Sequence, residues 1–204
     1  MSIRSDQELL SEMADGDELA FAAIYNRHKE AVYAFCVKML QDRVMAQDVL
    51  QDVFLKAFQR REQLCEVESL KAWLLRVARN RCLNLLRDNR RTSRLTETDG
   101  AIMASSRPTP LAEMERSEQV ALLNECLLAL SPPYREVIVL REYQNLAYED
   151  IAEVTDTTVS SVKSRLFKAR RKLAELLAPY ATWHDSTEAK SEPSRPTAAP
   201  APKK

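Results

Sequence analysis

The chain has 204 residues, 45% of them hydrophobic, and its 30 basic and 30 acidic side chains give a formal net charge of zero at pH 7. Only two glycines occur, and alternating apolar and polar runs are absent, which leaves little material for β-hairpins or Gly-rich phosphate loops. We therefore expect an all-α fold with one ordinary core or two small ones.

The charge is unevenly distributed, although it sums to zero. Acidic side chains crowd the first third of the chain, and basic ones concentrate in residues 76–94 and 163–172, the second of which contains no acid. Two cationic stretches indicate two contacts with a polyanion, and the acidic surface indicates a different partner. A solvated charged face is the alternative for either stretch alone.

The cysteines and histidines do not have the spacing of a metal site. The chain has no Cys-x-x-Cys pair, and His28 and His184 lie far from a common cluster. We expect no metal and no cofactor, and reduced cysteines that fit a cytoplasmic location. No apolar run approaches the roughly 20 residues needed to cross a bilayer, and the acidic N-terminus is unlike a signal peptide, so we expect no membrane insertion. The four cysteines are Cys36, Cys65, Cys82 and Cys126.

After an acidic segment at residues 1–18, residues 19–91 contain three amphipathic stretches, which can close one small core. The first apolar stripe is Phe21, Ile24, Tyr25, Val32, Phe35 and Met39; the second is Ala46, Val49, Leu50, Val53, Phe54, Ala57 and Phe58; the third is Leu70, Trp73, Leu74, Val77, Ala78, Cys82 and Leu85.

The second stretch has a polar face opposite its apolar stripe, formed by Asp48, Gln51, Asp52 and Leu55. An exposed leucine among carboxylates can bury against a protein partner, whereas the acids repel DNA. A single exposed leucine is often without function, so docking and no role are both open.

The third stretch places arginine and asparagine side chains opposite its apolar stripe. Arginine can hold phosphates or bases with two hydrogen bonds, and asparagine amides can pair with base edges. Trp73, on the flank of the stripe, fits either a core position or a platform for an unpaired base. The predicted contact residues are Arg76, Arg79, Asn80, Asn84, Arg87 and Arg90.

Residues 92–112 are rich in Ser, Thr and Pro without periodicity and are interpreted as a flexible linker. About 20 residues can reach about 65–70 Å when fully extended. A second helical domain is expected at residues 113–178, and the Pro-, Ala- and Ser-rich residues 179–204 are expected to be a disordered tail.

Within the second domain, residues 148–154 and 159–177 predict a helix-turn-helix, joined by a tight turn at residues 155–157. Hydroxyls near the start of the second helix can reach phosphates or bases, the cations release counterions, and Phe167 can contact a thymine methyl. Phe167 could instead cap the apolar stripe. The exposed face opposite that stripe comprises Ser160, Ser161, Lys163, Ser164, Phe167, Lys168 and Arg171.

Four segments in this order resemble the extracytoplasmic-function (ECF) sigma factors of bacteria. They are AQDVLQDVFLKAF (46–58), KAWLLRVARNRCLNLLRDNRR (71–91), LSPPYREVIVLREYQNLAYEDIAEV (130–154) and TTVSSVKSRLFKARRKL (157–173).

The resemblance implies a non-enzymatic promoter-specificity subunit. The first domain would be sigma region 2, which docks on the clamp helices of core RNA polymerase and opens the −10 element. The second would be region 4, which reads the −35 duplex next to the polymerase flap. An anti-sigma factor is a further implied partner. By this resemblance Asp48, Gln51 and Asp52 match the polymerase-docking stretch, residues 64–69 the loop that captures a flipped base, and Lys163, Ser164 and Phe167 the −35 contacts.

Two residues depart from the family pattern in the helix-turn-helix. Asp156 stands where the family usually has glycine, but aspartate tolerates left-handed dihedral angles. Ala147 stands where a capping serine is common, and losing the cap costs about 1 kcal/mol.

Two other function classes compete with this interpretation. A stand-alone helix-turn-helix repressor or activator would need a dimer surface and tight duplex binding without polymerase. A nucleic-acid enzyme would need a carboxylate cluster, metal-ligand spacing or a Gly-rich loop, and the sequence offers none of these.

Overall fold

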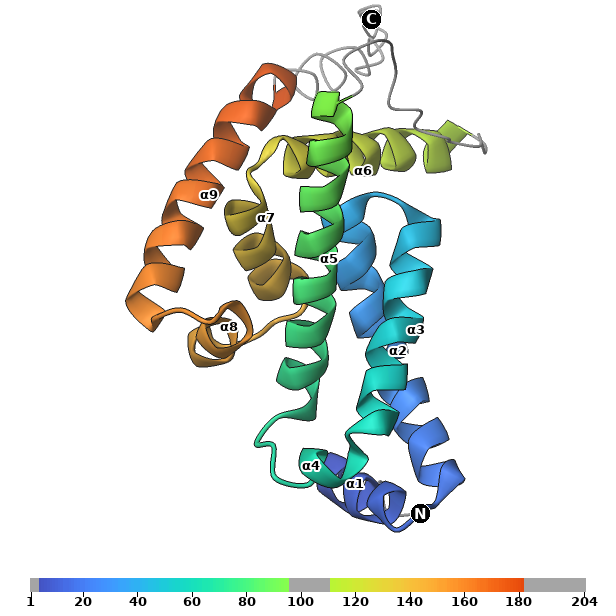
Figure 1. Ribbon diagram of the computed structural model, residues 1–204. Helices are drawn as coiled ribbons and strands as arrows, with labels where there is room; N and C mark the ends of the chain where they lie inside the picture. Colours follow the sequence, from blue (N-terminus) through green and yellow to red (C-terminus); the bar gives the residue numbers. More distant parts are fainter. Residues whose placement is uncertain (1–3, 96–110, 182–204) are drawn as a thin grey trace, which may run out of the picture.

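The computed structural model describes residues 4–95 and 111–181, and all regular secondary structure in these two ranges is helical (Figure 1). The all-α prediction is therefore confirmed. None of the helices in this part of the chain is long and apolar enough to cross a membrane. Most of the expected linker and tail, residues 96–110 and 182–204, lies outside the described residues.

The helices of the first range form what we call the N-terminal unit. Its core is closed by the three predicted stripes, with Ile24, Val53 and Leu74 each at most 1% exposed. Phe58 differs from the prediction, because it is 41% exposed and meets the ring of Phe21 edge to face at the margin of the core. The helices are α1 (Asp6–Ala14), α2 (Glu18–Leu40), α3 (Arg43–Gln59), α4 (Arg61–Leu64) and α5 (Leu70–Leu95).

Helix α1 was not predicted from the sequence, where residues 1–18 stand out only as acidic. Its Leu9, Leu10 and Met13 side chains are buried against the rest of the unit. The helix begins with a capping box, in which Ser5 Oγ accepts a hydrogen bond from the Glu8 backbone N–H and the Glu8 carboxylate accepts one from the Ser5 N–H. The acidic composition thus hides an amphipathic helix.

The sharp turn between α2 and α3 follows from two adjacent residues. Gln41 adopts left-handed dihedral angles (φ 55°) and ends α2, and its N–H bonds to the Val37 carbonyl. Asp42 then caps α3, because its carboxylate accepts hydrogen bonds from the backbone N–H groups of Val44 and Met45. The two helices therefore run back against each other.

The helices of the second range form the C-terminal unit. The helix that begins at Pro132 continues to Tyr143, but its second half is a π-helix, so the last turn is wider than an α-helical turn. The elements are α6 (Leu111–Ala129), α7 (Pro132–Ile138), the π-helix η1 (Val139–Tyr143), α8 (Tyr148–Thr155) and α9 (Val159–Ala181).

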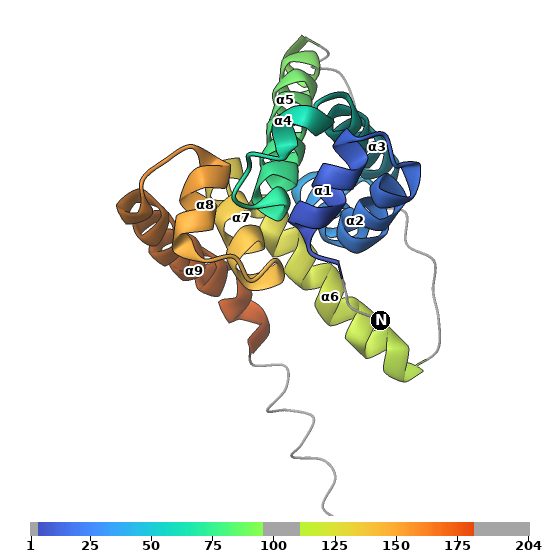
Figure 2. The same cartoon turned by 90° about the horizontal axis from the view of Figure 1, so that it is seen from below.

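The two units pack against each other. Helix α8 lies along α5, and η1, α6 and α7 contact α2. Figures 1 and 2 show α5 between the other helices of its own unit and the α7–α9 group. One face of α5, the helix predicted to contact DNA, is therefore covered by the other unit.

Candidate nucleic-acid interface

Helices α8 and α9 form the predicted helix-turn-helix. Asp156 adopts left-handed angles (φ 52°, ψ 55°), as expected for the glycine position of the turn. Ala147 cannot cap α8 with its side chain, but its N–H donates to the Asp150 carboxylate at 3.3 Å, so half of a capping box remains. Thr158 then holds the first turn of α9, because its hydroxyl accepts a hydrogen bond from the Ser161 N–H.

The predicted apolar stripe of α9 is buried and the opposite face is open. Val162, Leu166 and Ala169 are at most 2% exposed, and Phe167 is 69% exposed. Phe167 therefore lies largely outside the core, with its ring open to a partner. Of the other predicted contact residues, Ser161 is half-buried and the rest are exposed: Ser160, Lys163, Ser164, Lys168 and Arg171.

A shallow basic pocket of about 300 Å³ lies beside Lys163 and Phe167 and is also lined by Tyr148, Arg170 and Arg171. The Lys163 ammonium lies 5.6 Å from the Tyr148 ring centre, so α8 orients this cation. Arg170 is held by Glu142 at 2.6 Å, and this hydrogen bond raises the pKa of Arg170. Sequence reasoning missed Tyr148 and Arg170, which could have been found only from the packing of α8 and η1 beside α9.

The predicted −10 face of α5 is divided in two. Arg76, Asn80, Asn84 and Arg87 are exposed. Arg79 is not, because its guanidinium is bonded to Glu136 of the C-terminal unit and only 15% of the side chain is exposed. The side chain of Arg90, the sixth predicted contact, lies outside the described residues.

A second pocket, of about 330 Å³, lies between α3 and α5. Lys56 of α3 and Arg60, which directly follows α3, line it together with Trp73, Arg76 and Asn80 of α5. Trp73 is partly buried and packs against the core, while it also lines this pocket. Sequence reasoning missed Lys56 and Arg60, because nothing in the sequence indicates that α3 faces this side of α5.

The loop at residues 64–69 is held by helix α1. Gln7 donates a hydrogen bond to the Val67 carbonyl at 2.9 Å, and the Cys65 thiol donates to the Leu10 carbonyl at 3.6 Å. At the end of the loop, the Ser69 hydroxyl accepts from the Ala72 N–H and so begins α5. Helix α1, which was not predicted from the sequence, therefore supports this loop.

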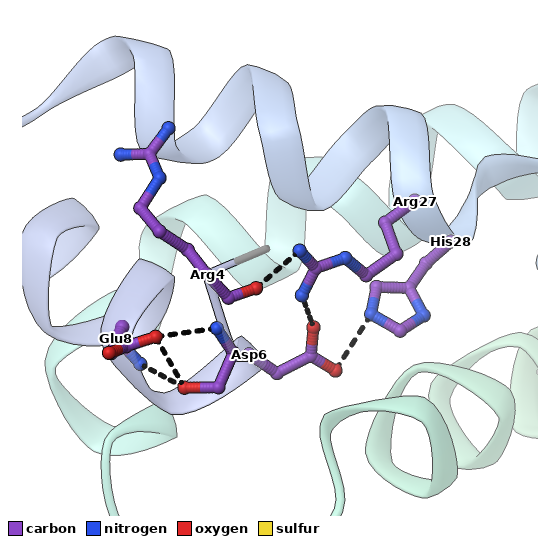
Figure 3. Close-up of polar contacts among 6 residues, drawn as sticks. Arg4, Asp6, Glu8, Arg27 and His28 are labelled. Atoms are coloured by element: carbon purple, nitrogen blue, oxygen red, sulfur yellow. Dashed lines mark hydrogen bonds and ion pairs between the residues drawn. The ribbon is translucent and has the colours of Figure 1, made fainter. Parts of the chain in front are cut away.

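A polar cluster fixes α1 on α2. Figure 3 shows the Asp6 carboxylate between Arg27, at 2.5 Å, and the buried His28, at 2.9 Å. Arg27 also donates to the Arg4 carbonyl. Burial lowers the pKa of His28, and the neighbouring Asp6 opposes that shift without cancelling it.

The predicted docking face of α3 is exposed throughout. Asp48, Gln51 and Asp52 reach solvent, and Leu55 is 57% exposed. Asp52 also forms an ion pair with Arg81 of α5 at 2.9 Å, with half of each side chain exposed. The face is thus an acidic patch with a leucine at one end.

The described residues contain no group of three or more His, Cys, Asp or Glu side chains that could hold a metal ion. The four cysteines are free thiols. Cys36 and Cys82 are fully buried between α2 and α5, and their mutual hydrogen bond and burial raise the pKa of the Cys82 thiol. A protonated, buried thiol is a small apolar side chain and a poor nucleophile.

Two protein-family models match the chain. The model of sigma-70 region 2 matches residues 24–92, and the model of sigma-70 region 4 matches residues 121–173. The matched residues cover most of α2, all of α3 and α4, most of α5 and most of the C-terminal unit.

Characterised relatives are similar over almost their whole length. The RNA polymerase sigma-H factor of Pseudomonas aeruginosa is 30% identical over 182 residues, which cover 85% of this chain and 94% of the relative. The ECF RNA polymerase sigma-E factor of Escherichia coli K12 is 28% identical, with 86% and 95% covered.

Two solved structures are similar in fold. CnrH in complex with the cytosolic domain of CnrY has a TM-score of 0.65 and 27% identity, covering 85% of this chain and 97% of that chain. The sigma factor RpoE in complex with the anti-sigma factor NepR from Bartonella quintana has a TM-score of 0.61 and 25% identity, covering 78% and 96%.

Proposed function

The chain belongs to the ECF sigma factors, non-catalytic subunits of RNA polymerase that act in transcription initiation, and from this membership we propose which of its surfaces contact polymerase and promoter. The observation that carries the proposal is the face of α9. It presents Lys163, Ser164 and Phe167 to solvent directly opposite a buried stripe.

Helix α9 reads the −35 element in the major groove. Lys163 contacts the Tyr148 ring and lies near the start of the helix, from which base edges are reached, and Phe167 offers an apolar surface to a thymine methyl. Lys168 and Arg171 lie further along the helix and bind phosphates. Arg170 is tied to Glu142 and acts mainly to hold η1 against α9.

Helix α5 and the pocket beside it hold the −10 strand. Lys56, Arg60 and Arg76 bring three cations to one pocket, where they can neutralise the phosphates of a single strand. Trp73 and Asn80 line the same pocket, with a ring that can stack and an amide that can pair with a base. The loop at residues 64–69, held by α1, captures the unstacked base.

The acidic face of α3 docks on core polymerase, at the clamp helices. Leu55 is large, apolar and exposed, and Asp48 and Asp52 beside it repel DNA but complement a basic protein surface. Region 4 lies next to the polymerase flap. A role at polymerase and promoter implies a cytoplasmic location, and the sigma factor RpoE of similar structure, solved with the anti-sigma factor NepR, supports an anti-sigma factor as a further partner.

The test is reconstituted transcription. Purified core polymerase is mixed with the chain on a panel of genomic promoter fragments, and run-off products are mapped. We expect discrete start sites only when core polymerase and the chain are both present, and we expect the chain alone to bind duplex DNA weakly. Tight, specific duplex binding without polymerase, together with no run-off product, would support the repressor class instead.

A further inference from the structure

Helix α1 lies outside the family model of region 2, which begins at residue 24, and no contact with polymerase or DNA has been assigned to it. It is nevertheless firmly seated on the N-terminal unit. Leu9, Leu10 and Met13 are at most 2% exposed, and the Asp6 carboxylate is paired with two side chains of α2. A helix held by both apolar and charged contacts is a rigid element, so it can position a segment that it binds.

The segment that α1 binds is the loop at residues 64–69. Gln7 Nε2 donates to the Val67 carbonyl at 2.9 Å, although the two residues are 60 positions apart. The Cys65 thiol, a weak donor, lies 3.6 Å from the Leu10 carbonyl oxygen. Figure 1 shows α1 beside α4, the helix from which this loop leads to α5. The middle of the loop is therefore tied to α1.

The other hydrogen bonds of the loop lie toward its two ends. The Val67 N–H donates to the Leu64 carbonyl at the end of α4, and the Ser69 carbonyl accepts from the Trp73 N–H in the first turn of α5. These bonds join the loop to its flanking helices. In the described parts of the chain, Gln7 is the only side chain that donates to a carbonyl of this loop. The course of the loop between the helices therefore depends on Gln7.

Half-buried and exposed residues alternate along the loop. The half-buried ones are Cys65, Val67 and Ser69, and the exposed ones are Glu66 and Glu68. Cys65 and Val67 pack against the core of the unit, so the other side of the loop is the one that is open to a ligand. The carbonyl that α1 holds lies between the two exposed residues, and its position therefore affects how both are presented.

Selection of an unpaired base requires a loop of fixed shape. Such a base is recognised by hydrogen bonds to its edge and by stacking, and a binding site has to hold its groups within about 0.5 Å of the productive geometry. A loop that is bonded only at its ends would adopt several shapes and would bind several bases about equally well. A contact in its middle removes that freedom.

We propose that Gln7 is a positioning residue for base selection at the −10 element: by holding the Val67 carbonyl, it fixes the loop at residues 64–69 in the shape that distinguishes the captured base. This inference rests on the proposed function, which assigns base capture to that loop. Gln7 acts through the loop and not on DNA. Loss of the contact therefore relaxes the preference for one base of the −10 element and leaves polymerase binding and reading of the −35 element unchanged.

The decisive variant is Gln7→Glu, which keeps the size of the side chain but replaces the donor by an acceptor, so the hydrogen bond to the Val67 carbonyl is lost. Gln7 is exposed, and a carboxylate is favourable in the first turn of a helix, so the fold is kept. Ser11→Glu is the matched control, because it adds the same charge at an exposed position one turn later on α1. Gln7→Lys returns a donor to the position and should restore the contact.

The first measurement is the rate at which Cys65 is alkylated in the full-length chain, followed by mass spectrometry of the labelled peptide. Cys65 is half-buried, whereas the other three cysteines are at most 6% exposed, so Cys65 reports on the loop. Gln7→Glu should raise the rate about two- to ten-fold, as expected for loss of one hydrogen bond that restrains local opening. Gln7→Lys and Ser11→Glu should react like the unchanged chain. An unchanged rate in Gln7→Glu would overturn the proposal.

The second measurement is run-off transcription by each reconstituted holoenzyme from a library randomised across the −10 element. Gln7→Glu should relax the preference at one position about two- to ten-fold, and Gln7→Lys should restore it. An equal loss on all sequences would indicate a merely structural role, and faster alkylation with an unchanged preference would show that the loop does not need this contact to select a base. Either result would overturn the proposal.

The unchanged chain reports separately on the proposed function. If its own holoenzyme shows no base preference in the −10 element, base capture by the loop is itself wrong. If that preference is present and Gln7→Glu keeps it, only the role of Gln7 is wrong.

Discussion

Among single residues, the side chains of α9 that we propose to read bases lie earlier on the helix than those that we propose to hold phosphates. Lys163 and Phe167 are four residues apart, so they lie on one face of the helix about one turn from each other. Lys168 and Arg171 lie later on the helix and are exposed. The two pairs should therefore affect transcription differently.

Lys163→Ala and Phe167→Ala should each cost about 1–3 kcal/mol at the cognate −35 element and much less at a substituted one. Lys168→Ala and Arg171→Ala serve as controls and should weaken all promoters alike, with a smaller salt dependence. Transcription from a library randomised across the −35 element measures both effects. Unchanged base preferences in the first pair would contradict direct reading by this face.

His28 links stability to pH through the α1–α2 cluster. Burial lowers the pKa of His28 below its ordinary value of 6.5, so the unfolded chain binds the proton more readily than the folded one. The stabilisation by neutral His28 is therefore fully present above about pH 6.5 and is lost as the pH falls through the lower, folded-state pKa. His28→Gln should flatten this part of the stability profile.

Urea unfolding midpoints between about pH 5 and pH 8 measure that slope, over the range in which histidine titrates. Asp6→Asn is the informative partner variant. It removes the charge that raises the pKa of His28, so the histidine should titrate at a still lower pH by NMR. A histidine pKa that rises in Asp6→Asn would contradict the assigned contact.

At the scale of elements, α3 contributes its buried stripe to the core and its acidic face to solvent. Asp48 and Asp52 lie opposite the core, on the face that we propose docks on polymerase. Asp48→Arg combined with Asp52→Arg should therefore abolish co-purification with core polymerase. The melting temperature should change little, since the lost Asp52–Arg81 pair is half exposed and such pairs contribute about 0–1 kcal/mol. Glu62→Arg on α4 is a control of the same charge change, and normal polymerase binding by the double variant would refute the docking face.

Helix α1 is held to the N-terminal unit by apolar contacts. Leu10 is 1% exposed, so Leu10→Ala should reduce the free energy of unfolding by about 2–5 kcal/mol. Leu19 is 75% exposed, and Leu19→Ala should change stability by less than about 0.5 kcal/mol. Urea unfolding of the two variants compares the same substitution inside and outside the core; equal effects would show that α1 does not pack as described.

Helix positions could be predicted wherever the sequence carries a long apolar stripe. Helices α2, α3, α5 and α9 are of this kind, and the left-handed Asp156 was anticipated from the tolerance of aspartate for such angles. Helix α1 was missed because its composition is acidic, although the Ser5-x-x-Glu8 capping box was a usable signal. The π-helix at the end of α7 has no sequence signature comparable to a heptad or a cap.

At the scale of the whole molecule, side-chain exposure on α9 follows from periodicity, but exposure on α5 does not. Periodicity places Arg76 and Arg79 on the same polar side of α5, yet Arg76 is exposed and Arg79 is bonded to Glu136. The difference arises from a second unit that docks on one side of the helix. A single helix pattern carries no information about which of its polar residues a distant segment will cover.

This difference predicts that Arg76→Ala and Arg79→Ala affect binding of the −10 strand differently in the free chain and in the polymerase-bound protein. Arg76→Ala removes a contact to the −10 strand and nothing else, so it should weaken binding of a −10 single strand about equally in the free chain and in the holoenzyme. Arg79→Ala removes a predicted DNA contact but also the bond to Glu136 of region 4. Its loss in the holoenzyme, in which we expect polymerase to hold the two regions apart, should be about ten-fold, as expected for a hydrogen bond to a charged group.

In the free chain that loss should be largely offset, because the bond to Glu136 no longer has to break before DNA binds. Fluorescence anisotropy of a labelled −10 oligonucleotide, titrated with each variant alone and with each reconstituted holoenzyme, gives the four affinities needed. Asn84→Ala, which alters an exposed amide on α5 without touching region 4, provides the reference for a change that affects DNA alone. If Arg79→Ala loses as much affinity in the free chain as in the holoenzyme, Arg79 contacts DNA without being withheld by region 4.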